Sequence, residues 1–234
     1  MTIGEVIQRI QSLYSKGVQS DDTRLSARHI YNKLLSVRSR LIYQKVNKRQ
    51  MISTWSYQVI NCAELIKAPI SECPCLPTGA CSILRTKHKL PKPINSLDKH
   101  IISSVSTLDG ETMFDATTWA LAKYSTGNKY TSTKPGWYIK DEYMYITNLK
   151  ILKAITIMGL FDDPVEVSKF PSVCCDEGSV DDCECMLDKP FPIDSDLIDP
   201  MIELSVGELI EVFNSNREDQ TNDAKDNLTQ ETKS

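Results

Sequence analysis

The sequence predicts an α+β fold, in which a mainly antiparallel β domain lies between helices from the two ends of the chain. Three observations indicate this. Residues 21–49 place apolar side chains at helical spacing, residues 101–147 read as strands joined by tight turns, and residues 194–213 return to a helical pattern. We expect a helical part at residues 1–50, with the helix of 194–213 packed on it, and a β domain at 51–170.

The longest predicted helix runs from Asp21 to Arg49. Asp21 and Asp22 suit an N-cap and a negative first turn, and the 27 residues after them contain no proline, glycine or acid. Two neighbouring apolar stripes follow the helix, so we expect it to be packed on two sides. The stripes are Leu25, Ile30, Leu34, Val37 and Leu41, and Ala27, Tyr31, Leu35, Ile42 and Val46.

A shorter amphipathic helix is predicted at residues 3–16. Its apolar residues recur three and four positions apart, and Gly17 ends the pattern. Because only a short turn separates this helix from the long one, we expect the two to form an antiparallel pair.

The β domain begins with a strand predicted at residues 55–65. Residues 83–94 are extended and basic, and Pro91 and Pro93 argue against a central strand there. Residues 117–130 fit either a strand or a short helix.

Two hairpins and a last strand complete the predicted β domain. The first hairpin turns at Asp109-Gly110 and the second at Asp141-Glu142. A further strand within 150–161 is ended by Asp162-Asp163-Pro164, where the acids suit a turn or a helix cap.

The C-terminal part is acidic. Residues 171–193 form a cysteine-containing loop, residues 194–213 a helix, and residues 214–234 a polar tail that we expect to be extended and ordered only on a partner. Residues 1–161 hold 22 Lys and Arg against 11 Asp and Glu, whereas residues 162–234 hold 5 against 20. The balances of +11 and −15 suit basic-to-acidic packing between copies, or a basic face turned towards nucleic acid.

The eight cysteines and three histidines are the residues best suited to metal binding or catalysis. Cys73 and Cys75, and Cys183 and Cys185, form C-x-C pairs, which leave free thiols, disulfides and zinc open. Zinc prefers wider spacing, so we expect no structural zinc. Three histidines and the absence of known catalytic motifs indicate that the protein is not an enzyme and needs no cofactor.

The sequence gives no sign of a membrane protein. No apolar run reaches membrane-spanning length, and the N-terminus lacks the features of a secretory signal. We expect the protein to be made and assembled in a cytosol.

Over nearly the whole chain, the order and composition of the predicted elements resemble those of the head-to-tail adaptor, or ring, proteins of short-tailed bacteriophages. The resemblance is closest to the virion ring proteins of crAss-like phages. The resemblance is carried by the helix pair with TRLSARHIYNKLLSVRSRLIYQK, the hairpin GWYIKDEYMYI, the strand IMGLFDDPVEV, the helix opening FPIDSDLIDPMIEL and the polar tail.

The resemblance implies a structural virion protein. It implies a homo-oligomeric ring, typically of twelve copies, that docks on the portal at one capsid vertex, joins capsid to tail and binds further tail proteins. DNA would pass through its channel without sequence-specific contacts. The alternatives are another virion ring or decoration protein, and a nucleic-acid-binding module whose fold is held together by zinc.

Two sets of residues are candidates for these contacts. The DNA channel, or the acidic part of a neighbour, would be met by Arg28, Arg38, Arg40, Lys45, Lys48 and Arg49. The portal or a neighbouring subunit would be met by Phe213, Arg217 and Leu228.

Overall fold

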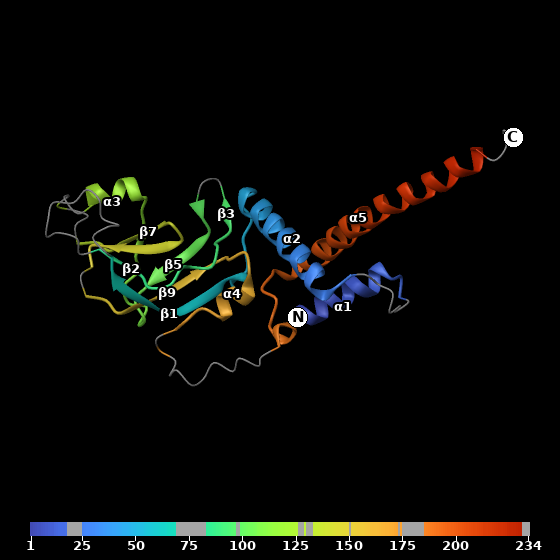
Figure 1. Cartoon of the computed structure of the whole chain (residues 1–234). Coiled ribbons are helices and arrows are strands. Elements are labelled where there is room, and N and C mark those ends of the chain that lie inside the picture. The colour runs from blue at the N-terminus through green and yellow to red at the C-terminus, as the bar shows by residue number, and fades with distance from the viewer. Residues whose placement is uncertain are drawn as a thin grey trace. The chain divides into compact units, whose positions relative to one another are not determined.

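The computed structural model describes residues 1–17, 25–68, 83–96, 99–125, 129, 133–149, 151–172, 174 and 185–230, with residues 213–230 given as backbone alone. The chain forms two compact units, which are described separately (Figure 1). The helical unit comprises Met1–Ile42 and Cys185–Ser234, and the barrel unit comprises Tyr43–Glu184. The predicted α+β class is confirmed.

Three helices and a short 3-10 helix form the helical unit, with α2 running five residues beyond it. They are α1 (Ile3–Tyr14), α2 (Ala27–Asn47), η3 (Met186–Asp188) and α5 (Ser195–Gln230). A capping box starts α1, because Thr2 Oγ1 accepts a hydrogen bond from Glu5 N and Glu5 Oε2 accepts one from Thr2 N. Two backbone bonds that define a Schellman motif end it, and they place Lys16 and Gly17 at φ 52° and 81°.

The two apolar stripes of α2 are confirmed. All five residues of the first stripe are buried, as are Tyr31 and Ile42 of the second. The predicted helix start is wrong, because α2 begins at Ala27 and Ser26 Oγ accepts a hydrogen bond from His29 N. Asp21 and Asp22 lie outside the described residues.

Two further predictions for this unit need correction. The main neighbours of α1 are α5 and η3 rather than α2. The helix expected to end at residue 213 continues as α5 to Gln230, and its last part projects beyond α1 and α2 (Figure 1). The expectation of an extended conformation is therefore wrong for residues 214–230. Beyond Gly207 the helix meets neither glycine nor proline, and each further residue adds one backbone hydrogen bond without a new nucleus.

The barrel unit is built on a seven-stranded sheet with the order β5-β9-β1-β2-β8-β7-β6. Every strand pair in it is antiparallel except β6–β7. The strands are β1 (Gln58–Lys67), β2 (Leu84–Thr86), β5 (Ile102–Ser106), β6 (Asp115–Ala116), β7 (Gly136–Lys140), β8 (Tyr143–Thr147) and β9 (Ala154–Gly159). Smaller elements are η1 (Thr54–Ser56), β3 (Asn95–Ser96), β4 (Lys99–His100), α3 (Trp119–Ser125) and α4 (Pro164–Ser168).

One continuous segment, residues 113–116, joins the two ends of this strand order. Met113 forms a bridge with Ser106 of β5, and Phe114 N donates to Val105 O over 2.8 Å. The next two residues are β6, which pairs with β7. The sheet therefore closes on itself as a barrel.

Side chains from every strand of the seven-stranded sheet except β6, together with Phe114 beside it, fill the barrel. This core consists of Ile60, Ala63, Leu65, Leu84, Leu90, Val105, Phe114, Trp137, Met144, Ile146, Ile155, Ile157, Phe161 and Val167. A smaller cluster lies under α3, where Ala122 packs with the stacked rings of Tyr138 and Tyr145.

The hairpin predictions agree with the structure. Asp141 and Glu142 both have positive φ, as a type I′ turn between β7 and β8 requires, and Gly110 has φ 73° in the turn after β5. Asp163 caps α4 by accepting a hydrogen bond from Val165 N. The prediction that prolines exclude a central strand is wrong for residues 84–86, because β2 ends before Pro91 and pairs on both sides.

Candidate functional site

The basic residues of α2 are the first group expected to carry function, and the structure divides them. Arg38 is fully buried, its Nε donates to Pro192 O over 2.9 Å, and its guanidinium lies 5.9 Å from the centre of the Phe191 ring. The expectation that Arg38 faces a channel or a neighbouring subunit is therefore wrong. Its position on the helix could have indicated this, since it lies four residues from both Leu34 and Ile42 in the apolar stripes.

Two other cations of α2 share one carboxylate of α5. Glu208 accepts hydrogen bonds from Lys33 Nζ and, over 2.5 Å, from Arg40 Nη2. These two bonds, that from Lys33 first, hold the pKa of Glu208 below its usual value. The Arg40 side chain keeps 45% of its surface exposed, so it can still meet another charged group.

The other predicted basic residues lie nearer the solvent. Arg28, Lys48 and Arg49 are exposed, and Lys45 is half-buried. Lys48 and Arg49 take no part in an ion pair within the described part of the chain. Arg49 has φ 54° at the Schellman motif that ends α2, so the chain turns sharply just after these two cations.

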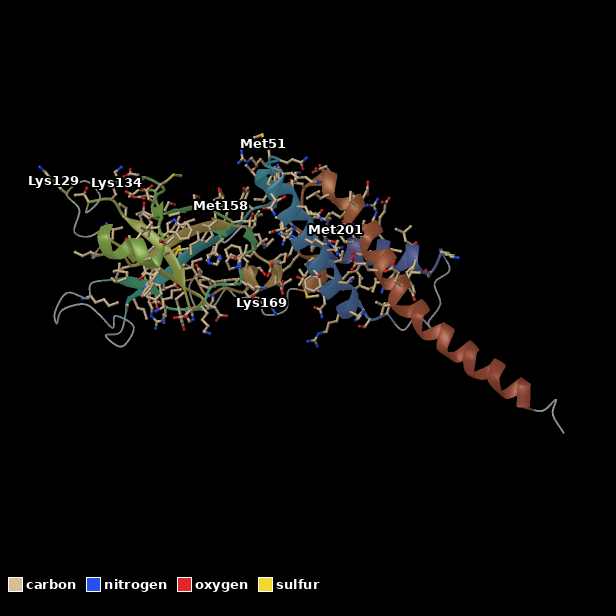
Figure 2. All side chains as sticks on the ribbon, turned by 90° about the horizontal axis from the view of Figure 1, so that it is seen from above. Met51, Lys129, Lys134, Met158, Lys169 and Met201 are labelled. Carbon is tan, nitrogen blue, oxygen red and sulfur yellow. A yellow bond between two sulfur atoms is a disulfide. The ribbon has the colours of Figure 1, made fainter. Side chains whose placement is uncertain are left out.

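Large apolar side chains lie close to these cations in the sequence and are exposed. Met51 and Trp55 are 92% and 87% exposed, and Tyr43 on the last turns of α2 is 40% exposed. Figure 2 shows Met51 just beyond the C-terminal end of α2. We name Tyr43, Lys48, Arg49, Met51 and Trp55 the basic–aromatic segment. Met51 and Trp55 were not among the predicted contact residues. Trp55 stood at the start of the strand predicted at residues 55–65, whereas it lies in η1 and β1 begins at Gln58.

The outer face of α5 has the opposite charge. Helical spacing places Asp199, Glu203, Leu204, Ile210 and Glu211 on the side away from the buried Met201, Ile202 and Leu209, and all five are exposed. We name these five residues the acidic–apolar face. The predicted contact residues Phe213, Arg217 and Leu228 lie on the projecting part of α5, where the backbone alone is described.

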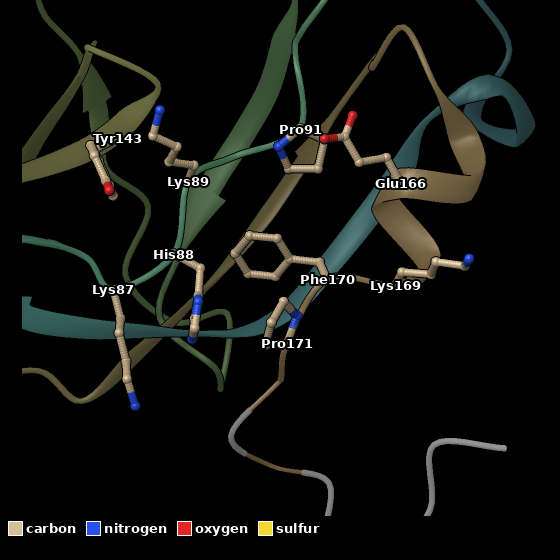
Figure 3. A pocket seen from close by; sticks show the side chains of 9 residues that line it. All are labelled: Lys87, His88, Lys89, Pro91, Tyr143, Glu166, Lys169, Phe170 and Pro171. Carbon is tan, nitrogen blue, oxygen red and sulfur yellow. The ribbon is translucent and has the colours of Figure 1, made fainter. Parts of the chain in front are cut away.

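A pocket of about 480 Å³ opens on the barrel unit (Figure 3). It is lined by Lys87, His88, Lys89, Pro91, Tyr143, Glu166, Lys169, Phe170 and Pro171. Lys87 pairs with Glu64 over 2.7 Å and Lys89 with Glu142 over 2.6 Å. These pairs balance most of the positive charge, so the pocket does not form a concentrated anion site.

Of the eight cysteines, Cys62 and Cys174 form a disulfide, while Cys185 is an exposed free thiol. Cys62 sits at a bulge in β1, between Ile60 and Ala63, and has φ 55°. The bond ties β1 to the chain that follows α4. Of the alternatives left open by the sequence, a disulfide therefore applies to this pair, while Cys73, Cys75, Cys81, Cys175 and Cys183 lie outside the described residues.

The described residues contain neither a metal-binding cluster nor a membrane-spanning helix. Their His, Cys, Asp and Glu side chains do not gather in a group that could hold a metal ion. Among the described helices, none carries an apolar stretch that could cross a membrane.

Comparison with known proteins gives two matches. The family described as "Phage tail ring protein 2" matches residues 5–228. The chain is also 30% identical over 240 residues to Ring protein 2 of Bacteroides phage crAss001, an alignment that covers 97% of this chain and 98% of that protein. The family match thus covers the barrel unit with the basic–aromatic segment, and nearly all of the helical unit and of α5.

Proposed function

Because the chain belongs to the phage tail ring protein 2 family, and is thus a structural ring protein of a crAss-like phage virion, we propose that it forms a homomeric ring beneath the portal. The ring joins capsid to tail and contains twelve copies. The observation that carries this proposal is the extent of the family match, which includes both units and nearly all of α5. The large apolar side chains exposed on the isolated chain also support assembly, because such side chains are common at interfaces.

The ring lines the channel through which DNA passes. The exposed or partly exposed cations Arg28, Arg40, Lys45, Lys48 and Arg49 support this, since a basic wall attracts phosphates without reading sequence. Cations that do not face the channel meet the acidic part of the neighbouring subunit.

The projecting part of α5 contacts the portal. Phe213, Arg217 and Leu228 lie along it, and a helix that extends beyond its own unit is suited to reach a second protein (Figure 1). Other tail proteins bind the opposite side of the ring. The particle assembles in the cytoplasm of the bacterial host.

The assembly can be tested with the purified chain and its portal protein. Mass photometry and electron microscopy should give rings of twelve copies, and the full chain should bind the portal. A chain that lacks residues 214–234 should melt at the same temperature as the full chain but bind the portal more weakly. Monomers under all conditions, or undiminished portal binding by the truncated chain, would contradict the corresponding part of the proposal.

The channel is tested in assembled particles. Replacement of Arg28 and Lys45 by Glu should leave ring formation intact and slow DNA passage during ejection. The matched control replaces Lys134 and Lys153, two exposed lysines of the barrel unit, by Glu. Equal ejection rates for both variants would remove α2 from the channel wall.

A further inference from the structure

We propose that adjacent copies of this chain are joined by the basic–aromatic segment of one copy packing on the acidic–apolar face of α5 in the next. This inference rests on the proposed ring and names the surfaces that close it. The occupant of each surface is therefore a second copy of this chain.

The basic–aromatic segment has the composition of an interface centre. Met51 and Trp55 expose nearly their whole side chains, and Tyr43 contributes a third apolar group. Aromatic residues and methionine are enriched at interfaces, where their burial supplies most of the affinity. The flanking Lys48 and Arg49 have no carboxylate partner within the described residues, so they are available to a partner of opposite charge.

The acidic–apolar face offers what this segment lacks. Glu203 and Glu211 are exposed and form no ion pair within the described part of the chain, and Leu204 and Ile210 lie between them in sequence. Asp199 adds a third carboxylate, which lies 3.9 Å from Arg9 Nη1. From Asp199 to Glu211 the face is roughly 18 Å long, at about 1.5 Å per helical residue.

The two surfaces match in charge and in apolar content. Two unpaired cations meet two unpaired carboxylates, while Met51 and Trp55 meet Leu204 and Ile210. If each copy uses one surface towards one neighbour and the other surface towards the next, the contact is heterologous, and its repetition around a closed rotation makes a ring.

Two charge-reversal variants of the full chain test the pairing. In the first, Lys48 and Arg49 are both replaced by Glu; in the second, Glu203 and Glu211 are both replaced by Lys. Each should raise the concentration needed for half-assembly by about thirtyfold, because two attractive pairs become repulsive. The matched control is the Lys134→Glu and Lys153→Glu variant, which should assemble as the unchanged chain does. Circular dichroism verifies that each variant is folded.

Mixing the two variants decides whether the contact joins different copies. Alternating copies restore every charge pair, so an equimolar mixture should form rings at the wild-type concentration, as should the chain that carries all four replacements. If the chain with all four replacements formed rings but the mixture did not, the contact would lie within one chain and the inference would be overturned. Normal assembly of either double variant would also overturn the inference. If the variant with Lys48 and Arg49 replaced by Glu then assembled but lost DNA binding, these two cations would be assigned to DNA. If the unchanged chain formed no ring, the proposed function itself would fail.

Discussion

The Cys62–Cys174 disulfide should be a major source of stability in the barrel unit. It joins residues 112 positions apart in the sequence, so it encloses most of the barrel in one covalent loop. For a loop of this length, the lost chain entropy of the unfolded state corresponds to about 5 kcal/mol at 25 °C. The barrel unit contains about 140 residues, whose unfolding entropy makes this equivalent to a shift of roughly 15 °C in Tm.

The measurement compares thermal unfolding of the oxidised chain, the chain with reductant, and a Cys62→Ala and Cys174→Ala variant. Reduction and double replacement should lower Tm by the same amount, and reductant should change the variant little. Peptide mapping after thiol blocking verifies the bond in the oxidised sample. Cys185→Ala, which removes an exposed free thiol, is the control and should melt with the unchanged chain. A mapped bond whose reduction moved Tm by less than about 3 °C would refute the loop-entropy argument.

Three further predictions concern the helical unit. Arg38→Ala should lower the free energy of unfolding of this unit, measured by urea denaturation, by about 3–5 kcal/mol, because the substitution empties a buried site and removes the donor to Pro192 O. A loss below about 1 kcal/mol would contradict the burial of Arg38. Lys16→Gly should raise its stability by about 0.5–1 kcal/mol, since glycine adopts the positive φ at this helix end without strain, and unchanged stability would argue against the Schellman motif. The lowered pKa of Glu208 gives stability that is present above its unfolded pKa and lost as pH falls through the folded pKa. Glu208→Gln should therefore be less stable than the unchanged chain at pH 7 and equal to it at the acid limit, and a constant difference would exclude the pairing with Lys33.

Local sequence patterns predicted most of the fold. Apolar spacing identified α1 and both buried stripes of α2, and the alternation around Asp141-Glu142 identified the β7–β8 hairpin. These features depend on residues close in sequence, whose side chains must share one face. The same reasoning placed Arg38 with the surface cations, because its charge outweighed its position between apolar stripes. It also ended the last helix at residue 213, because the residues that follow are polar. Polar residues do not break a helix as glycine or proline does, so the helix continues.

Contacts between distant residues could not be predicted in this way. The pairing of Cys62 with Cys174 leaves no mark on either local sequence, and Cys62 lies within a strand pattern. Closure of the barrel by residues 113–116 uses backbone groups, which every residue carries. For the candidate site, the composition of α2 indicated the cations, but only burial separated Arg38 from Lys48 and Arg49. The exposure of Met51 and Trp55 likewise required the fold around them.

Closure of the barrel determines how copies of this chain can meet. An open sheet would present unpaired backbone groups on which a second chain could add a strand, and such growth has no built-in end. In this protein the segment 113–116 occupies that position on β5 and continues into β6. Within the described residues, copies at high concentration therefore have no long strand edge of this sheet from which to polymerise into fibres. Their association depends on side-chain recognition, which is specific in angle and can stop when a circle is complete.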